Sequence, residues 1–166
     1  MRFVIVTGMS GAGKSTALRM LEDAGYFCID NLPILLIPKL ADLLLMPNSE
    51  INKIALGIDV RNGDALKEIA KTLENLEQSS LEYQILFLEA NNRVLVKRYK
   101  ETRRNHPLSK EGRVDEGISE ERVRLWFLKQ KADYIIDTSQ LLTRELKEEI
   151  NKIFVKNKEF KNLYVT

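Results

Sequence analysis

The chain has 166 residues, of which 44% are apolar and 30% are charged, and its formal net charge is +2. This length and composition predict one soluble domain with a single core and exclude a largely disordered chain. The charge is too small for a general binder of polyanions, and no apolar run is long enough to span a membrane. One cysteine excludes an internal disulfide, and we expect Cys28 to be the buried thiol of a cytoplasmic protein.

Short apolar runs alternate with helical patterns along the chain, which predicts a parallel sheet flanked by helices. The strand candidates are residues 3–6, 26–29, 53–58, 84–88 and 134–136. Each is apolar over consecutive positions, as is typical of strands covered on both faces. We expect a three-layer α/β domain over residues 1–155 with a mostly parallel five-stranded sheet, and we assign residues 156–166 to a tail or linker.

Three segments carry clear helical patterns. One has its buried stripe at Leu66, Ile69, Ala70, Leu73 and Leu76. A second is expected to begin at Ser119 as N-cap and to bury Val123, Trp126 and Phe127. The last, over residues 141–154, is expected to bury Leu142, Leu146, Ile150 and Phe154.

The stretch GMSGAGKST, residues 8–16, matches the pattern G-x-x-x-x-G-K-[ST]. It follows the strand-like RFVIVT and precedes the helix-like KSTALRMLEDAG, which is expected to end at Gly25. In that setting the loop's N–H groups and the helix N-terminus bind phosphate, which predicts a P-loop NTPase or kinase-like domain. The alternative, a tight turn with a chance lysine, does not explain why strand, loop and helix agree. The expected nucleotide-binding residues of the loop are Gly8, Met9, Ser10, Gly11, Ala12, Gly13, Lys14, Ser15 and Thr16.

The loop also indicates how phosphate and metal are handled. We expect Lys14 to reach the β- and γ-phosphates and the Ser15 hydroxyl to ligate Mg²⁺. Three acids follow strand candidates and would lie at the same sheet edge: Asp30, Asp59 and Glu89. Asp59 is the first choice as a catalytic and metal-binding acid, because the third strand often lies next to the P-loop strand. For each acid, capping of the next helix is the alternative.

Asp30 opens the segment DNLP. Either Asp30 or Asn31 could cap a helix that has Pro33 in its first turn. The same segment, beside a phosphate site, is also where a second substrate or a base could be placed. The sequence leaves these two interpretations open.

A basic segment occupies residues 91–113, where eight Lys/Arg and two Glu give a local charge of +6. Small P-loop kinases carry a lid between their fourth and fifth strands, so residues 91–118 are expected to be lid-like. Arg103 and Arg104 are the leading candidates for clamping transferred phosphoryl groups, with Arg98 and Arg113 behind them. Alternatives are a solvated helix face or a nucleic-acid contact. His106, the sole histidine, is more typical of a surface residue than of a catalyst.

Taken together, these stretches resemble the RapZ/YvcJ family of bacterial P-loop nucleotide-binding proteins. The matching pieces are GMSGAGKS, GYFCIDNLP, IALGIDVRN, RYKETRRNHPL and ADYIIDTS, which follow in order over nearly the whole chain. The combination of DNLP, DVRN and ETRR-x-HPL is much more specific than the P-loop alone. The resemblance implies ATPase and GTPase activity, with ATP at residues 8–15 and a guanine-nucleotide site formed by Asp59, Val60, Arg61 and Asn62.

The chain departs from the family in two ways. Asn105 stands where another basic residue is expected, and the family's second, C-terminal domain is not part of this sequence. In some relatives that domain binds small regulatory RNA and delivers it to a ribonuclease. Contact with RNA or a ribonuclease is therefore expected only through that domain, and the sequence leaves homo-oligomer formation open.

The sequence is compatible with three functions. The first is a regulatory switch that binds ATP and GTP and hydrolyses them slowly with Mg²⁺. The second is a small-molecule kinase that uses the same site, and the third is a nucleotide-sensing RNA or protein adaptor with little catalysis. We expect ATP and GTP to share one pocket, because Asp59 should lie close to the metal.

Overall fold

The computed structural model describes residues 2–59, 63–102 and 114–154. Within these residues the chain forms one five-stranded sheet in the order β2-β3-β1-β4-β5, and every neighbouring pair is parallel. The strands are β1 (Arg2–Gly8), β2 (Phe27–Ile29), β3 (Lys53–Gly57), β4 (Tyr83–Glu89) and β5 (Tyr134–Asp137). The predicted α/β class and parallel sheet are confirmed, and all five strands occur at the predicted places in the sequence.

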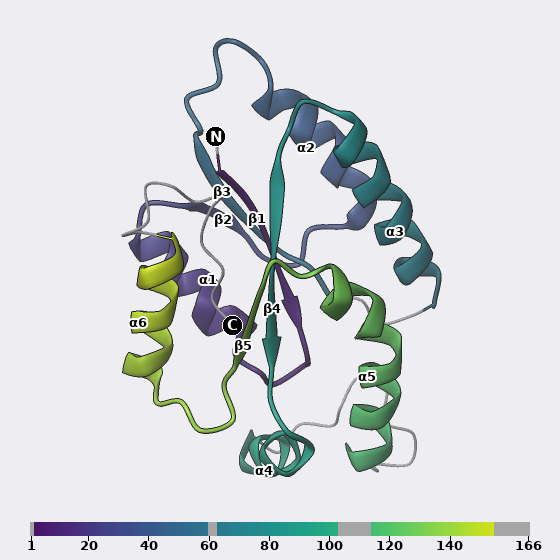
Figure 1. Cartoon of the computed structure of the whole chain (residues 1–166), viewed down its shortest axis with the longest axis vertical. Coiled ribbons are helices and arrows are strands. Elements are labelled where there is room, and N and C mark those ends of the chain that lie inside the picture. The colour runs from purple at the N-terminus through teal and green to yellow at the C-terminus, as the bar shows by residue number, and fades with distance from the viewer. Residues whose placement is uncertain (1, 60–62, 103–113, 155–166) are drawn as a thin grey trace.

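Helices cover both faces of the sheet, which gives the three layers (Figure 1). One face carries α1 (Lys14–Asp23) and α6 (Thr143–Phe154), which pack together. The other carries α2 (Ile37–Leu44), α3 (Gly63–Gln78) and α5 (Val114–Lys131), while α4 (Asn92–Thr102) lies below the carboxyl end of β4 and packs on α5. A short 3₁₀ helix, η1 (Ile34–Leu36), leads into α2.

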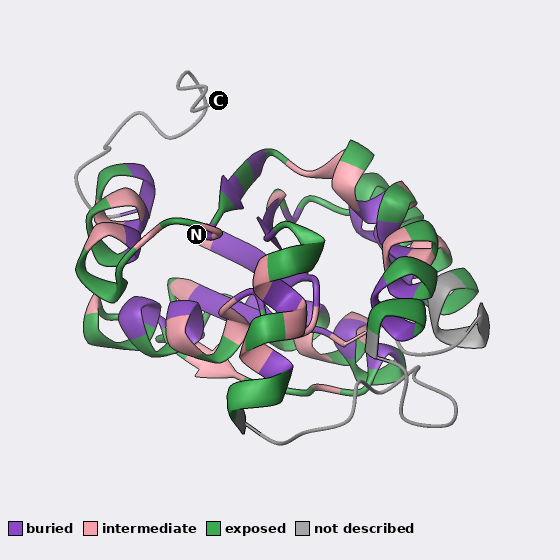
Figure 2. Cartoon of the chain, turned by 90° about the horizontal axis from the view of Figure 1, so that it is seen from below, coloured by how far each residue is buried: buried purple, intermediate pink, exposed green. Residues whose placement is uncertain are grey.

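The central strands are buried on both faces, as their sequences predict. Phe3, Val4, Ile5 and Val6 of β1 are nearly inaccessible, and so are the middle residues of β3 and β4. Figure 2 shows buried residues gathered on the sheet and on the inner faces of the helices. Strands that are apolar at consecutive positions are suited to a place between two covering layers, and β3, β1 and β4 occupy that place in the sheet.

The two edge strands differ from the prediction. Tyr134 and Ile136 of β5 are buried, but Ile135 between them is exposed, so the strand alternates. Phe27 of β2 is likewise exposed. An edge strand is not covered fully on both faces, and an apolar run alone does not distinguish it from a central one.

The helical predictions are partly confirmed. Ile69, Leu73 and Leu76 are buried and Ala70 partly so, whereas the side chain of Leu66 lies outside the described part. The structure shows Ser119 inside α5 rather than at its N-cap, because that helix begins at Val114. Val123 and Trp126 are exposed, since Ile118, Leu125 and Leu128 form the buried stripe instead.

The last helix closes the domain against the sheet. Leu146, Ile150 and Phe154 are buried as predicted, whereas Leu142, which precedes the helix, is exposed. The carbonyl of Phe154 accepts hydrogen bonds from Arg2 at 2.6 Å and Tyr26 at 3.2 Å. In the described part of the chain, no helix combines the length and the apolar character needed to cross a membrane.

Candidate phosphate-binding site

The glycine-rich loop leaves β1 at a point where only glycine fits. A Cβ on Gly8 would lie 2.2 Å from the carbonyl oxygen of Leu88 on β4. The same carbonyl accepts a hydrogen bond of 3.0 Å from the N–H of Met9, which is fully buried. The first residues of the loop are thus fixed against the neighbouring strand.

The loop ends at the N-terminus of α1, which has no side-chain cap. Gly13 occupies the N-cap position in the left-handed conformation, with φ of 108°, and no acidic residue lies in the first turn. The first N–H groups of an α-helix have no acceptor within the helix, and together with the helix dipole they favour an anion. An uncapped helix after a curled loop is therefore suited to bind phosphate.

Lys14, the first residue of α1, pairs with Asp59, which follows β3. Both side chains are largely shielded from solvent. The two meet because β3 lies directly beside β1, so both chain segments reach the same edge of the sheet. The predicted neighbour relationship of the third strand and the P-loop strand is thus confirmed.

The oxygen groups near this pair fit magnesium. Ser15 is exposed in the first turn of α1, on the residue after Lys14. Mg²⁺ prefers one or two protein oxygens together with phosphate oxygens and waters, so a hydroxyl and one carboxylate suffice. No group of three His, Cys, Asp or Glu suited to a metal occurs among the described residues.

Two polar side chains hold the outer part of the loop by its carbonyl groups. Arg98 of α4 donates to the carbonyl of Gly11 at 2.8 Å and to the carbonyl of Thr138 at 2.8 Å. The buried Thr138 hydroxyl, just after β5, donates to the carbonyl of Ala12 at 2.8 Å. With its carbonyls held from outside, the loop keeps a fixed shape. Arg98, predicted as a lid or substrate residue, thus supports the loop.

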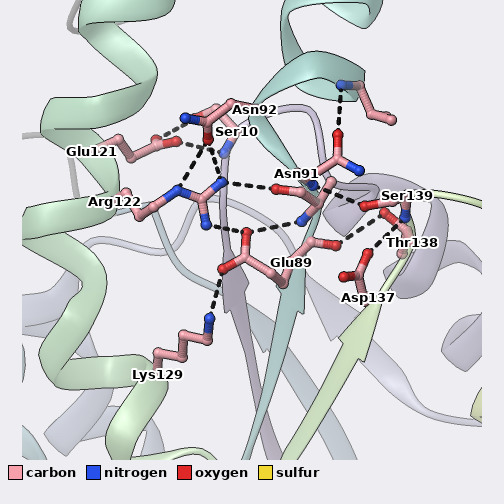
Figure 3. A network of polar contacts seen from close by, with 12 residues as sticks. Ser10, Glu89, Asn91, Asn92, Glu121, Arg122, Lys129, Asp137, Thr138 and Ser139 are labelled. Carbon is pink, nitrogen blue, oxygen red and sulfur yellow. Dashed lines mark hydrogen bonds and ion pairs between the residues drawn. The ribbon is translucent and has the colours of Figure 1, made fainter.

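A third support comes from α5 (Figure 3). The carboxylate of Glu121 accepts hydrogen bonds from the N–H of Ser10 at 2.8 Å and from its hydroxyl at 2.6 Å. Glu121 is 3% exposed. Three consecutive loop residues, 10 to 12, are therefore held by α5, α4 and the end of β5.

Glu89, the third acid considered for metal, is engaged by cations. Its carboxylate lies 2.7 Å from Arg122 and 3.0 Å from Lys129, both of α5, and also accepts the N–H of Ala90. Figure 3 shows it enclosed between these groups. Of the three strand-end acids, Asp59 is the one that contacts the lysine of the loop.

The segment after β2 does not cap a helix in the predicted way. Pro33 is the N-cap of η1, and neither η1 nor α2 has a side-chain cap hydrogen bond. Asn31 instead adopts a left-handed conformation with φ of 58°. Asp30 is exposed and lies close to Gly57, where a Cβ would meet its Oδ1 at 2.6 Å. The turn at Asn31 carries the chain away from the sheet before a helix begins.

Several predicted site residues lie outside the described part of the chain. They are Val60, Arg61 and Asn62 after β3, and Arg103, Arg104, His106 and Arg113 of the basic segment. The tail, residues 156–166, also lies outside it. Their roles stay predictions.

Two residues that contact the loop, Glu121 and Thr138, are not among those predicted from the sequence. A signal exists for Glu121, because it shares a helical stripe with the buried Ile118, Leu125 and Leu128. A carboxylate on a buried stripe requires polar partners. For Thr138 the only signal is its place at the end of a strand that shares the sheet edge with the loop.

Cys28 lies on the edge strand β2 and is not part of the glycine-rich loop. It is partly buried and its Sγ lies 3.2 Å from the carbonyl oxygen of Leu18. Burial, with a smaller contribution from Glu22, raises the pKa of this thiol to about 11. The thiol is thus less buried than predicted, and its raised pKa disfavours the thiolate, which is the reactive form.

The five-stranded parallel sheet, with a glycine-rich loop after β1, is a P-loop kinase-like fold. A shikimate kinase from Acinetobacter baumannii in complex with shikimate matches with a TM-score of 0.60 over 96% of each chain, at 18% identity. A sugar kinase from Janibacter matches with a TM-score of 0.55, covering 92% of this chain and 93% of that one, at 15% identity. At such identities the likeness concerns the fold alone.

By its sequence, the chain belongs to the family described as the RapZ-like N-terminal domain, whose model matches residues 1–158. It is 63% identical over its full length to a nucleotide-binding protein of Agathobacter rectalis. It is 61% identical to one of Lachnoclostridium phytofermentans, again over its full length. The chain spans 57% and 58% of the length of these two relatives.

Proposed function

We propose that this chain binds ATP and GTP at the glycine-rich loop and hydrolyses them slowly with Mg²⁺, as a regulatory switch. One observation carries the proposal: Lys14 begins an uncapped helix after the loop and pairs with Asp59 at the end of the adjacent strand. This arrangement brings a cation, free helix N–H groups and a carboxylate to one place. The relatives' name, nucleotide-binding protein, supports it.

The roles follow from what each group can donate or accept. Lys14 would leave Asp59 to contact the β- and γ-phosphates, beside the N–H groups at the start of α1. The Ser15 hydroxyl and the Asp59 carboxylate, through water, would hold the metal. Magnesium, when bound, would neutralise charge on the phosphates. Arg103 or Arg104 would stabilise the charge that develops during transfer.

We expect hydrolysis to be slow because of how the attacking water would be placed. Among the described residues we assign no side chain to orient the attacking water. Positioned phosphates without a positioned nucleophile give binding but little rate acceleration. A switch requires long-lived bound states rather than rapid turnover.

One pocket would serve both nucleotides. Asp59 contacts Lys14 of the loop, so a guanine-nucleotide site built on residues 59–62 would begin within the same phosphate site. We expect unlabelled GTP to displace labelled ATP completely. Independent saturation by the two nucleotides would contradict a shared pocket.

Phosphate release from ATP and GTP with Mg²⁺ tests the activity. The unmutated chain is compared with Lys14→Ala and with Lys39→Ala, a control on the exposed part of α2. We expect slow release that is lost in Lys14→Ala and unchanged in Lys39→Ala. Equal release from both variants and the unmutated chain would contradict the proposal.

The same assay separates the alternatives. Nucleotide binding without release, followed by product formation when hydroxyl acceptors are added, would favour a small-molecule kinase. RNA binding that weakens steeply with salt, without any hydrolysis, would favour an adaptor that uses the basic segment.

A further inference from the structure

Glu121 makes an unusual contact for a residue beside an anion site. Both of its carboxylate oxygens accept hydrogen bonds from Ser10, one from the N–H at 2.8 Å and one from the hydroxyl at 2.6 Å. Figure 3 shows the side chain extending from α5 towards the loop. A carboxylate next to bound phosphates would repel them, so this position needs a physical reason.

Burial makes the contact costly unless it is fully satisfied. Glu121 is 3% exposed, and an unpaired buried carboxylate is strongly unfavourable. Hydrogen bonds from a backbone N–H and a hydroxyl to an ionised oxygen are among the strong ones. The two bonds to Ser10 therefore hold the loop and the glutamate together.

The helix that carries Glu121 is itself fixed at this level. The next residue, Arg122, donates to the carbonyl of Ala90 at 2.8 Å and to the side chain of Asn92 at 2.7 Å, and pairs with Glu89. One turn of α5 thus contacts both the end of β4 and the loop after β1. The contacts of Arg122 thus anchor the turn of α5 from which Glu121 binds Ser10.

The contact also decides which N–H groups of the loop remain for an anion. Ser10 donates its N–H to Glu121, and Ala12 donates its N–H to the carbonyl of Met9 at 3.0 Å. The anion-binding groups must then come from the rest of the loop and the start of α1. The two hydrogen bonds to Glu121 fix Ser10 and with it the part of the loop that leads to those groups.

We propose that Glu121 is a positioning residue for nucleotide binding and hydrolysis, acting through its two hydrogen bonds to Ser10. It does not touch the nucleotide and does not take a proton from water. The inference rests on the proposed function, because it assumes that the loop binds a nucleoside triphosphate.

Two conservative variants distinguish the effect of the length of the Glu121 side chain from the effect of its charge. Glu121→Gln keeps the length of the side chain, and its amide can accept the Ser10 N–H and donate to the hydroxyl, but it removes the charge. Glu121→Asp keeps the charge, but its carboxylate is one methylene shorter and should not span both bonds. Glu120→Gln on the adjacent, exposed position, which pairs with Arg124, is the matched control.

The measurements are the Kd of Mg-ATP by titration calorimetry, kcat for phosphate release, and thermal unfolding of each variant. We expect Glu121→Asp to raise Kd at least about tenfold and Glu121→Gln to stay within about threefold in Kd and kcat, with Glu120→Gln unchanged. A kcat that is lost in Glu121→Gln at unchanged Kd would overturn the inference, because the carboxylate would then act on water. Tighter binding by either variant would also overturn it, since Glu121 would be competing with phosphate.

The failure of the inference is distinguishable from that of the proposed function. An unmutated chain that does not bind Mg-ATP contradicts both. An unmutated chain that binds Mg-ATP while Glu121→Asp binds it equally well overturns only the positioning role. If Glu121→Asp does not fold, Ser10→Ala, which removes the hydroxyl alone, is expected to raise Kd about threefold or more, and an unchanged Kd overturns the role.

Discussion

Lys14 and Asp59 form an ion pair that joins the first turn of α1 to the end of β3. The pair exists because strand β3 lies beside β1 in the sheet, although 45 residues separate the two partners in sequence. In this pair the carboxylate of Asp59 neutralises the charge of Lys14, which a bound phosphate could neutralise instead. Nucleotide binding would therefore exchange one anionic partner of Lys14 for another and release Asp59 towards a metal.

Replacing Asp59 tests this exchange. In Asp59→Asn the amide no longer neutralises Lys14 or attracts Mg²⁺, so the metal should bind more weakly. We expect the magnesium concentration for half-maximal phosphate release to rise about tenfold or more, as measured by titrating Mg²⁺ at saturating ATP. Asp42→Asn, on the exposed part of α2, is the control. An unchanged magnesium requirement would show that Asp59 has no part in holding the metal.

Thr138 should matter for both stability and the loop. In Thr138→Val the carbonyl of Ala12 loses its hydrogen bond and Arg98 loses an acceptor. We expect the free energy of unfolding, measured with urea, to fall by about 1–3 kcal/mol, because buried polar groups are left unsatisfied. Thr138→Ser keeps the hydroxyl and should lose less. Equal stability of all three proteins would mean that the hydroxyl does not hold the loop.

Gly8 and Gly25 make a matched pair, because both have positive φ but only one is crowded. A Cβ at Gly8 would overlap the Leu88 carbonyl, whereas nothing lies within 4 Å of a Cβ at Gly25. Gly25→Ala should cost about 1 kcal/mol from its left-handed backbone alone. Gly8→Ala should cost clearly more and should weaken ATP binding, since β1 and β4 must separate. Denaturant unfolding of both variants checks this, and equal costs would refute the crowding.

Cys28 gives a pH-dependent prediction. Burial raises its pKa from the ordinary 9.0 to about 11, so at pH 8 the folded chain contains far less thiolate than the unfolded chain. We expect alkylation by iodoacetamide at pH 8 to be at least about tenfold slower in the folded chain than in urea. Since the folded state holds the proton more tightly, the free energy of unfolding should fall as the pH rises from about 9 towards 11. Equal alkylation rates in the folded and unfolded chains would contradict this environment.

The sequence predicts the centre of the sheet and the loop well for a physical reason. The middle positions of β1, β3 and β4 are apolar and buried. The spacing of Gly8, Gly13 and Lys14 leaves few alternatives to a phosphate-binding loop. These features are local in the chain. The place of Asp59 beside the loop could also be predicted, because strand order follows from common βα connectivity.

What could not be predicted depends on contacts between distant segments. Glu121 lies 111 residues from Ser10, and Thr138 lies 126 residues from Ala12. Helical periodicity did not place α5 correctly, since Val123 and Trp126 are exposed while a glutamate lies on the buried stripe. The helix instead faces the core with Ile118, Leu125 and Leu128, and the partner of Glu121 on that stripe lies in the distant loop.

Nucleotide binding at this loop is tested most directly by the affinity of the unmutated chain and of Lys14→Ala for Mg-ATP, measured by titration calorimetry. We expect saturable binding to the unmutated chain and a Kd at least about tenfold higher for Lys14→Ala, because the lysine supplies a charge-assisted contact to the phosphates. Thermal unfolding confirms that the variant is folded. A folded Lys14→Ala chain that binds Mg-ATP as tightly as the unmutated chain would contradict nucleotide binding at this loop.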